Sequence, residues 1–172
     1  MKLLLENWNK YLTEDQTFYH GTSENAGRSI LKSGFSLSAA GARQKALHGK
    51  DIVEIGGIYL TSEKDRAKWY AGPDNTTPGM NQGGAVVETK ISGKIMPEKE
   101  WWDIKRKISQ EIGGGLYDDE MNKQKNEEAV RRAKEMGYVG FQENTDPNEI
   151  IVFDPENIKV MGGFLVGKGE KL

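Results

Sequence analysis

The stretch QTFYHGTSENAGRSILKSG, residues 16–34, predicts a strand followed by a turn and a helix. Residues 16–19 favour a short strand that ends at His20 and the glycine after it. Ser23 is a good N-cap, and the helix after it carries apolar side chains at helical spacing until Gly34, a residue type that commonly ends helices. This strand–turn–helix unit is the first building block that we expect in the fold.

A second unit of the same kind is expected between residues 57 and 72. The apolar segment 57–60 predicts a strand, and Thr61 with the serine after it can cap a helix that continues to Gly72. The two units are separated by residues 35–56, a long segment of small and polar residues that predicts an irregular loop. Loops of this length often carry function, so this one could cover a site.

The remainder of the chain predicts more short strands and one further clear helix. Residues 85–95 alternate as one strand does, and Ala129, Ala133 and Met136 recur at helical spacing before Gly137. Three closing strands are expected at residues 138–142, 149–153 and 157–161. Short strands interspersed with helices indicate an α+β fold.

Length and composition limit the function classes. The 172 residues fit one domain, here expected over residues 15–172, with a short amphipathic helix or leader over residues 1–14. The chain has no cysteine, which excludes disulfides, thiolate metal sites and cysteine nucleophiles. The 24 basic and 26 acidic residues nearly balance, so the net charge does not indicate a nucleic-acid or membrane partner. No apolar run approaches the ~20 residues of a membrane span, and we expect a soluble, cytoplasmic protein.

Three features could carry chemistry. Gly21 after His20 leaves backbone groups accessible to an amide ligand, although a core or turn histidine satisfied by the backbone is the alternative. Tyr59 and Tyr70 could hold a planar cationic ring between their faces, or could simply pack in the core. Glu149 could stabilise positive charge at a sugar carbon whose glycosidic bond breaks, or could be a solvated edge residue. Each feature is weak alone, and only their combination is informative.

Taken in order, His20, the pair Tyr59 and Tyr70, and Glu149 resemble the His-Tyr-Glu pattern of diphtheria-toxin-like and poly(ADP-ribose) polymerase-like ADP-ribosyltransferases. Bacterial and phage members of this superfamily contain segments similar to several in this chain. The similar segments are YHGTS (19–23), GIYLTS (57–62), residues 128–138 and residues 148–160.

The resemblance implies a fold of two small, mostly antiparallel sheets around an NAD cleft with flanking helices. It also implies a role for each matching residue. His20 would bond an adenosine-side ribose hydroxyl, and the Gly21 backbone would hold the nicotinamide carboxamide. Tyr59 and Tyr70 would sandwich the nicotinamide ring, while Glu149 would orient the nicotinamide ribose and support an oxocarbenium-like transition state. Two weaker expectations concern Thr22, which would contact NAD, and Arg43 or Lys45, which would meet the pyrophosphate.

Two departures from the family pattern bear on the reaction. Poly(ADP-ribose) polymerases place a serine where this chain has Ala67, which implies single transfer rather than polymer formation. Pro147 stands two residues before Glu149, where arginine-modifying relatives have Glu or Gln, so arginine is not the expected acceptor. We therefore expect a mono-ADP-ribosyltransferase that releases nicotinamide. NAD hydrolysis, or a catalytically inactive module that binds NAD or is packaged in a virion, remain the alternatives.

The expected partners follow from the same comparison. NAD is the substrate, no metal is needed, and the acceptor is expected to be a protein rather than a nucleic acid or membrane component. Residues 1–12 are similar to the openings of small tailed-phage proteins, where a leader can direct a passenger into the capsid; a docking helix is the alternative. A monomer is expected.

Overall fold

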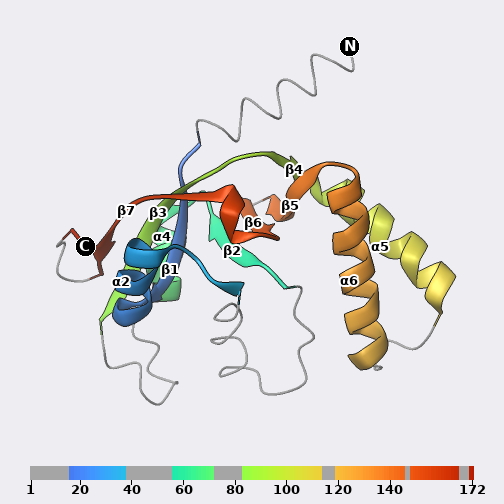
Figure 1. The fold of residues 1–172 in the computed structure, drawn as a ribbon, viewed down its shortest axis with the longest axis horizontal. Helices are drawn as coiled ribbons and strands as arrows, with labels where there is room; N and C mark the ends of the chain where they lie inside the picture. Colours follow the sequence, from blue (N-terminus) through green and yellow to red (C-terminus); the bar gives the residue numbers. More distant parts are fainter. Residues whose placement is uncertain (1–15, 38–55, 72–82, 114–118, 146–147, 167–170) are drawn as a thin grey trace, which may run out of the picture.

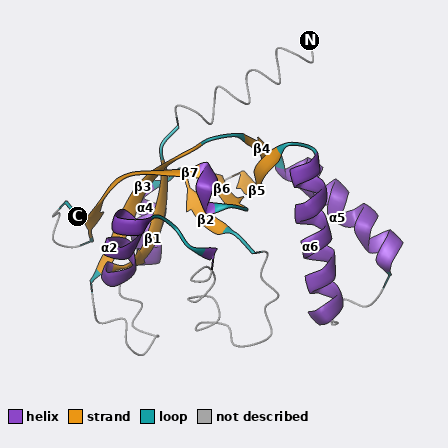
Figure 2. Ribbon diagram, in the orientation of Figure 1, coloured by secondary structure: helices purple, strands orange, loops and turns teal. Residues whose placement is uncertain are grey.

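Seven strands form one hydrogen-bonded sheet in the computed structural model, and helices cover its faces (Figures 1 and 2). The structure describes residues 16–37, 56–71, 83–113, 119–145, 148–166 and 171–172. The strands are β1 (Phe18–Ser23), β2 (Ile58–Thr61), β3 (Gly84–Ile91), β4 (Lys94–Met96), β5 (Tyr138–Thr145), β6 (Asn148–Val152) and β7 (Ile158–Leu165). The helices are α2 (Glu24–Ser33), α4 (Lys64–Ala71), α5 (Glu98–Ile112), α6 (Asp119–Glu135) and the 3₁₀ turn η3 (Pro155–Asn157). The fold is therefore α+β, as the sequence predicts.

The strand order β4-β5-β6-β2-β1-β3-β7 divides the sheet into two halves. All neighbouring strands are antiparallel except β4 and β5. Between β1 and β2, in the middle of the sheet, Tyr19 opposite Thr61 is the only registered pair that the described residues record. The expectation of two separate sheets is thus corrected: the two groups of strands are halves of one sheet, joined at a single residue pair.

The first predicted unit forms with one change in its boundaries. The Ser23 side chain accepts a hydrogen bond from the Ala26 N–H at 3.4 Å and caps α2, and Gly34 ends the helix with φ of 79°. However, β1 does not stop before His20 but continues to Ser23, because it pairs with β3 along its whole length. His20 and Gly21 therefore lie inside a strand and not in a turn.

Helices α2 and α4 pack on opposite faces of the sheet. A Cβ on Gly27 of α2 would lie 2.5 Å from the Ala85 side chain, whereas a Cβ on Gly84 would lie 1.6 Å from the Ala71 carbonyl oxygen of α4. Successive strand residues point to opposite faces, so the adjacent Gly84 and Ala85 place the two helices on different sides. In both contacts the helix comes close enough that only glycine fits.

Helices α5 and α6 pack together at the other end of the sheet (Figure 1). They cover a core in which Trp101 is fully buried and stacks on Phe141, with ring centroids 3.8 Å apart. The sequence indicated only α6, and its predicted buried face was partly wrong. Ala129 and Ala133 are buried, but Met136 lies beyond the helix end with 57% of its surface exposed.

Two other expectations differ from the structure or lie outside it. The single strand predicted over residues 85–95 is two strands, because the chain turns at Gly93, where φ is 125°. The predicted helix or leader over residues 1–14, and residues 38–55 of the predicted loop, lie outside the described residues. Within the described residues, none of the helices combines the length and apolar character needed to cross a membrane.

Candidate functional site

Glu149 lies at the start of β6, beside the junction between the two halves of the sheet. It is 8% exposed, and its Oε1 accepts a hydrogen bond from the Tyr70 hydroxyl at 2.9 Å and another from Arg66 Nε at 3.1 Å. Both donors come from α4, where residues four positions apart share one face of the helix. The helix therefore presents a cation and a hydroxyl to one carboxylate that is almost enclosed.

The charges around Glu149 fix the protonation states of its partners. The hydrogen bond to Glu149 is the largest influence on Arg66 and raises the pKa of its guanidinium, which stays charged. Burial raises the pKa of Tyr70, and the hydrogen bond to Glu149 raises it further. Tyr70 is therefore a neutral phenol at physiological pH and remains a donor.

Tyr59 reaches the same place from β2. Thr61 lies opposite Glu149 and Tyr59 lies opposite Ile151 in the β2–β6 ladder. Because side chains two positions apart share a face of the sheet, Tyr59 and Glu149 are diagonal neighbours on that face. Tyr59 is partly buried against the core cluster that contains Ile151. The structure thus brings the two predicted tyrosines to Glu149 from different elements, one from β2 and one from α4.

His20 links the two halves of the sheet at the junction, and its side chain lies on the face that α2 covers, opposite to the face that carries Tyr59 and Glu149. Its Nδ1 lies 2.8 Å from the backbone carbonyl oxygen of Tyr59, and its ring meets the Phe35 ring edge-on with centroids 5.2 Å apart. A carbonyl oxygen only accepts, so Nδ1 carries the proton, and in the neutral ring Nε2 is the acceptor nitrogen. His20 therefore adds a side-chain connection from β1 to β2 next to the single backbone pair.

The side-chain position of Gly21 is occupied by α4. A Cβ there would lie 2.0 Å from the Ala67 carbonyl oxygen and 2.9 Å from the Tyr70 Cβ. Close helix packing therefore explains why this residue is glycine, and this reason differs from the ligand approach that the sequence suggested.

The backbone of Gly21 points toward β2. The Glu24 N–H donates to the Gly83 carbonyl at 2.9 Å, which makes these two residues a hydrogen-bonded pair at the end of the β1–β3 ladder. Hydrogen-bonded and non-bonded pairs alternate along an antiparallel ladder, so the N–H and C=O of Gly21 point away from β3. They face the place where β1 and β2 separate after the Tyr19–Thr61 pair. That orientation is the one an amide ligand at the junction would require.

The remaining predicted residues are not brought to Glu149. Thr22 lies on the face that α2 covers, since its Cγ2 is 3.7 Å from the Cβ position of Gly27. Arg43 and Lys45 lie outside the described residues.

Sequence reasoning missed two charged residues next to Glu149. Arg66 had a usable signal, because it precedes Tyr70 by one helical turn. No signal in the sequence indicates that Glu143 of β5 lies next to Glu149. The β5–β6 register shifts between Gln142 and Asn144, so that Glu143 is an extra residue opposite Glu149. Burial, and secondly the charge of Glu149, raise the pKa of Glu143.

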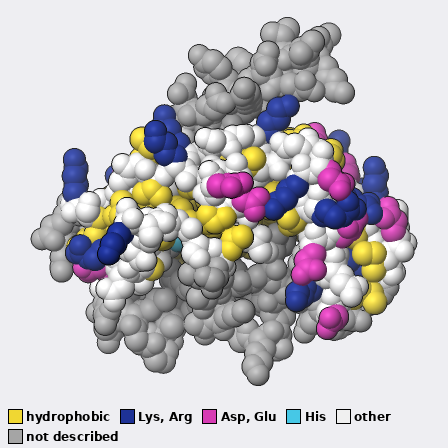
Figure 3. Space-filling model, viewed as in Figure 1, with side chains coloured by type: hydrophobic (Ala, Val, Ile, Leu, Met, Phe, Trp, Pro, Cys, Tyr) yellow, Lys and Arg dark blue, Asp and Glu magenta, His cyan; other side chains and the backbone are white. Residues whose placement is uncertain are grey.

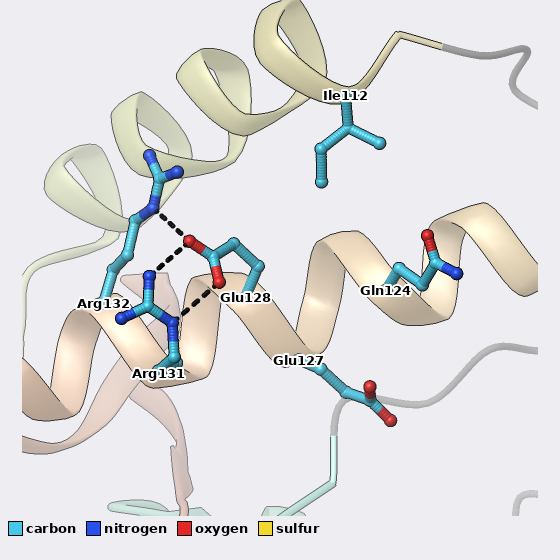
Figure 4. Close-up of a pocket in the computed structure, with 6 residues that line it drawn as sticks. All are labelled: Ile112, Gln124, Glu127, Glu128, Arg131 and Arg132. Atoms are coloured by element: carbon cyan, nitrogen blue, oxygen red, sulfur yellow. Dashed lines mark hydrogen bonds and ion pairs between the residues drawn. The ribbon is translucent and has the colours of Figure 1, made fainter.

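A surface hollow between α5 and α6 is a different kind of feature (Figure 4). Its lining residues are Ile112, Gln124, Glu127, Glu128, Arg131 and Arg132. The Arg131 and Arg132 guanidinium groups both bind the Glu128 carboxylate and lower its pKa to about 2. These charges satisfy one another, and none of the predicted site residues lines the hollow. Within the described part of the chain, no group of acidic, histidine or cysteine residues is arranged to hold a metal ion.

Comparison with known proteins adds no identification. The sequence matches no model of a protein family and no curated protein at a significant level.

Proposed function

We propose that the protein cleaves NAD at the nicotinamide glycosidic bond and transfers ADP-ribose once to an acceptor on a macromolecule. The observation that carries the proposal is the convergence of Tyr59, Tyr70 and Glu149 at the junction of the two half-sheets. Two aromatic rings beside an almost enclosed carboxylate suit a planar cationic ring attached to a ribose. The resemblance to His-Tyr-Glu transferases supports the same substrate.

In this proposal Glu149 works through its charge. The bond from the ribose anomeric carbon to nicotinamide breaks with its electron pair going to the ring nitrogen, so nicotinamide leaves neutral. The positive charge that develops on the ribose is stabilised by the carboxylate, as in glycoside hydrolysis. Tyr70, which donates to Oε1, holds the carboxylate in one orientation. A carboxylate that is already oriented before the reaction stabilises the transition state more than one that must first reorient.

The residues of β1 position the substrate. The Gly21 N–H and C=O can pair with the nicotinamide carboxamide, because both point to the junction. Nε2 of His20 accepts a hydrogen bond in the neutral ring and would receive a ribose hydroxyl. In this proposal the nicotinamide end of NAD lies between β1, β2 and α4 beside Tyr59 and Tyr70, and the ribose reaches His20 on the opposite face of β1.

The acceptor is proposed to be a protein. Figure 3 shows Lys and Arg side chains interspersed with Asp and Glu over the part of the surface formed by α5 and α6. Several of these charges are paired, such as Arg131 with Glu128 and Lys134 with Asp154. Nucleic-acid binding relies on clustered, uncompensated positive charge, and this surface is mixed.

Nicotinamide release from NAD by the purified protein tests the proposal, with and without bacterial lysate as a source of acceptors. Glu149→Ala is expected to lower release about 100-fold or more. The matched control is Glu156→Ala, which removes an exposed carboxylate from η3. Label from adenine-labelled NAD that becomes bound to lysate protein indicates transfer, whereas free ADP-ribose indicates hydrolysis. Release that is equal in wild type and Glu149→Ala would contradict the proposal.

A further inference from the structure

A second carboxylate, that of Glu143, lies beside Glu149. A β-bulge in β5 places Glu143 and Asn144 together opposite Glu149, where a regular ladder would place one residue. Bulges change the direction of a side chain and are common next to active sites. Glu143 is partly buried, and it lies close enough to Glu149 for the two charges to interact.

The two carboxylates have different surroundings. Glu149 is bound by the Arg66 guanidinium and the Tyr70 hydroxyl. For Glu143, burial comes first and the like charge of Glu149 second, and both disfavour its charged form. A pair of neighbouring acids whose environments differ in this way commonly divides two roles, one as fixed charge and one as proton acceptor.

We propose that Glu143 accepts the proton that the acceptor loses during transfer. The inference rests on the proposed function, because it assigns a step at the same site. It also names the acceptor class: a neutral group with a proton to lose, such as a hydroxyl, an amide or water.

The step balances without another reactant. The acceptor oxygen or nitrogen forms a bond to the anomeric carbon while the bond from that carbon to nicotinamide breaks. The electron pair of the broken bond stays on nicotinamide, and the proton of the acceptor goes to the Glu143 carboxylate. Glu143 then releases the proton to solvent, which its partial exposure permits.

Azide distinguishes this role from a structural one, because the azide anion attacks carbon without losing a proton. We expect Glu143→Gln to lower nicotinamide release with water as acceptor by about 100-fold, the usual contribution of a general base. Added sodium azide should restore release at least about tenfold in Glu143→Gln and form ADP-ribosyl azide. In Glu149→Ala azide should restore nothing, since departure of nicotinamide is itself impaired.

Matched variants complete the test. Glu143→Asp keeps a carboxylate that is one methylene shorter, so it should retain part of the water reaction. If Glu143→Gln fails to fold, Glu143→Asp replaces it in the test: a water reaction that is slower than wild type and rescued by azide supports the role of Glu143, and an unchanged water reaction overturns it. Glu156→Gln removes a charge elsewhere and should match wild type. A folded Glu143→Gln that equals wild type with water, or that azide does not rescue, would overturn the role of Glu143 and leave the proposed function intact. Wild-type release that does not depend on Glu149 would instead overturn the proposed function, and the inference with it.

Discussion

Tyr70 and Glu149 are 79 positions apart in the chain, and a hydrogen bond of 2.9 Å joins the hydroxyl of one to the carboxylate of the other. Tyr70→Phe removes this bond and keeps the ring. We expect kcat for nicotinamide release to fall about tenfold with little change in KM, because a hydrogen bond to a charged group is worth ~1.5 kcal/mol and the stacking surface remains. Steady-state kinetics check this, with Tyr70→Ala as the comparison that should also raise KM. A higher KM in Tyr70→Phe with unchanged kcat would contradict the orienting role.

Gly21→Ala should disrupt α4 and, through it, the position of Tyr70. The added Cβ would lie 2.0 Å from a backbone oxygen of the helix, which cannot move independently. Overpacking of this kind costs about 1–3 kcal/mol of the free energy of unfolding. Thermal melting measures the loss, and Gly162→Ala is the matched control, because nothing lies within 4 Å of its Cβ position. Equal melting temperatures for the two variants would contradict the packing seen at Gly21.

His20→Ala should weaken NAD binding more than it slows the chemical step. The variant loses the side-chain bond to the Tyr59 carbonyl and the proposed contact to a ribose hydroxyl. A rise in KM of about tenfold with a smaller change in kcat is expected for such losses. Phe35→Leu, which keeps the hydrogen bond and removes the ring contact, should have a smaller effect. A fall in kcat alone would place His20 in the chemistry rather than in binding.

The burial of Glu143 should make the protein less stable as the pH rises. Burial and the charge of Glu149 raise the folded-state pKa of Glu143 above its ordinary value, so the folded state holds a proton that the unfolded chain has already lost. The free energy of unfolding therefore falls as the pH rises from the unfolded to the folded pKa. Glu143→Gln removes this dependence, so its melting temperature should exceed that of wild type at about pH 7 and approach it at about pH 4. Identical differences at both pH values would contradict the shift.

The sequence was sufficient for local structure and for part of the site. Ser23 and Gly34 delimit α2 because capping depends on nearby residues alone. The sequence also indicates Tyr59, Tyr70 and Glu149 as candidate site residues, and the structure brings them together.

Long-range relationships were not predictable in the same way. Glu143 enters the site through a register shift between β5 and β6. The sequence of one strand does not reveal such a shift, because the shift depends on how the two strands pair. The sequence suggests that Gly21 leaves its backbone accessible to a ligand. It does not show that α4 packs into the space that a side chain at this position would occupy. The sequence does not clearly predict α5, because only two of its residues, Trp101 and Ile108, are buried and most of the others are charged or polar, so its apolar face is weak in the sequence.

The single pair Tyr19–Thr61 has a consequence for how binding and rigidity are linked. Among the described residues, one registered backbone pair joins the two half-sheets, while the His20 side-chain bond and an apolar cluster that includes Phe18, Leu60 and Ile150 also connect them; the backbone ladder is therefore weakest at the centre of the sheet. A ligand that bonds the Gly21 backbone on one side and contacts Tyr59 on the other takes the place of the absent ladder between β1 and β2. If NAD binds as proposed, it would bridge β1 and β2, and its binding should slow amide hydrogen exchange in β3 and β6, on both sides of the junction.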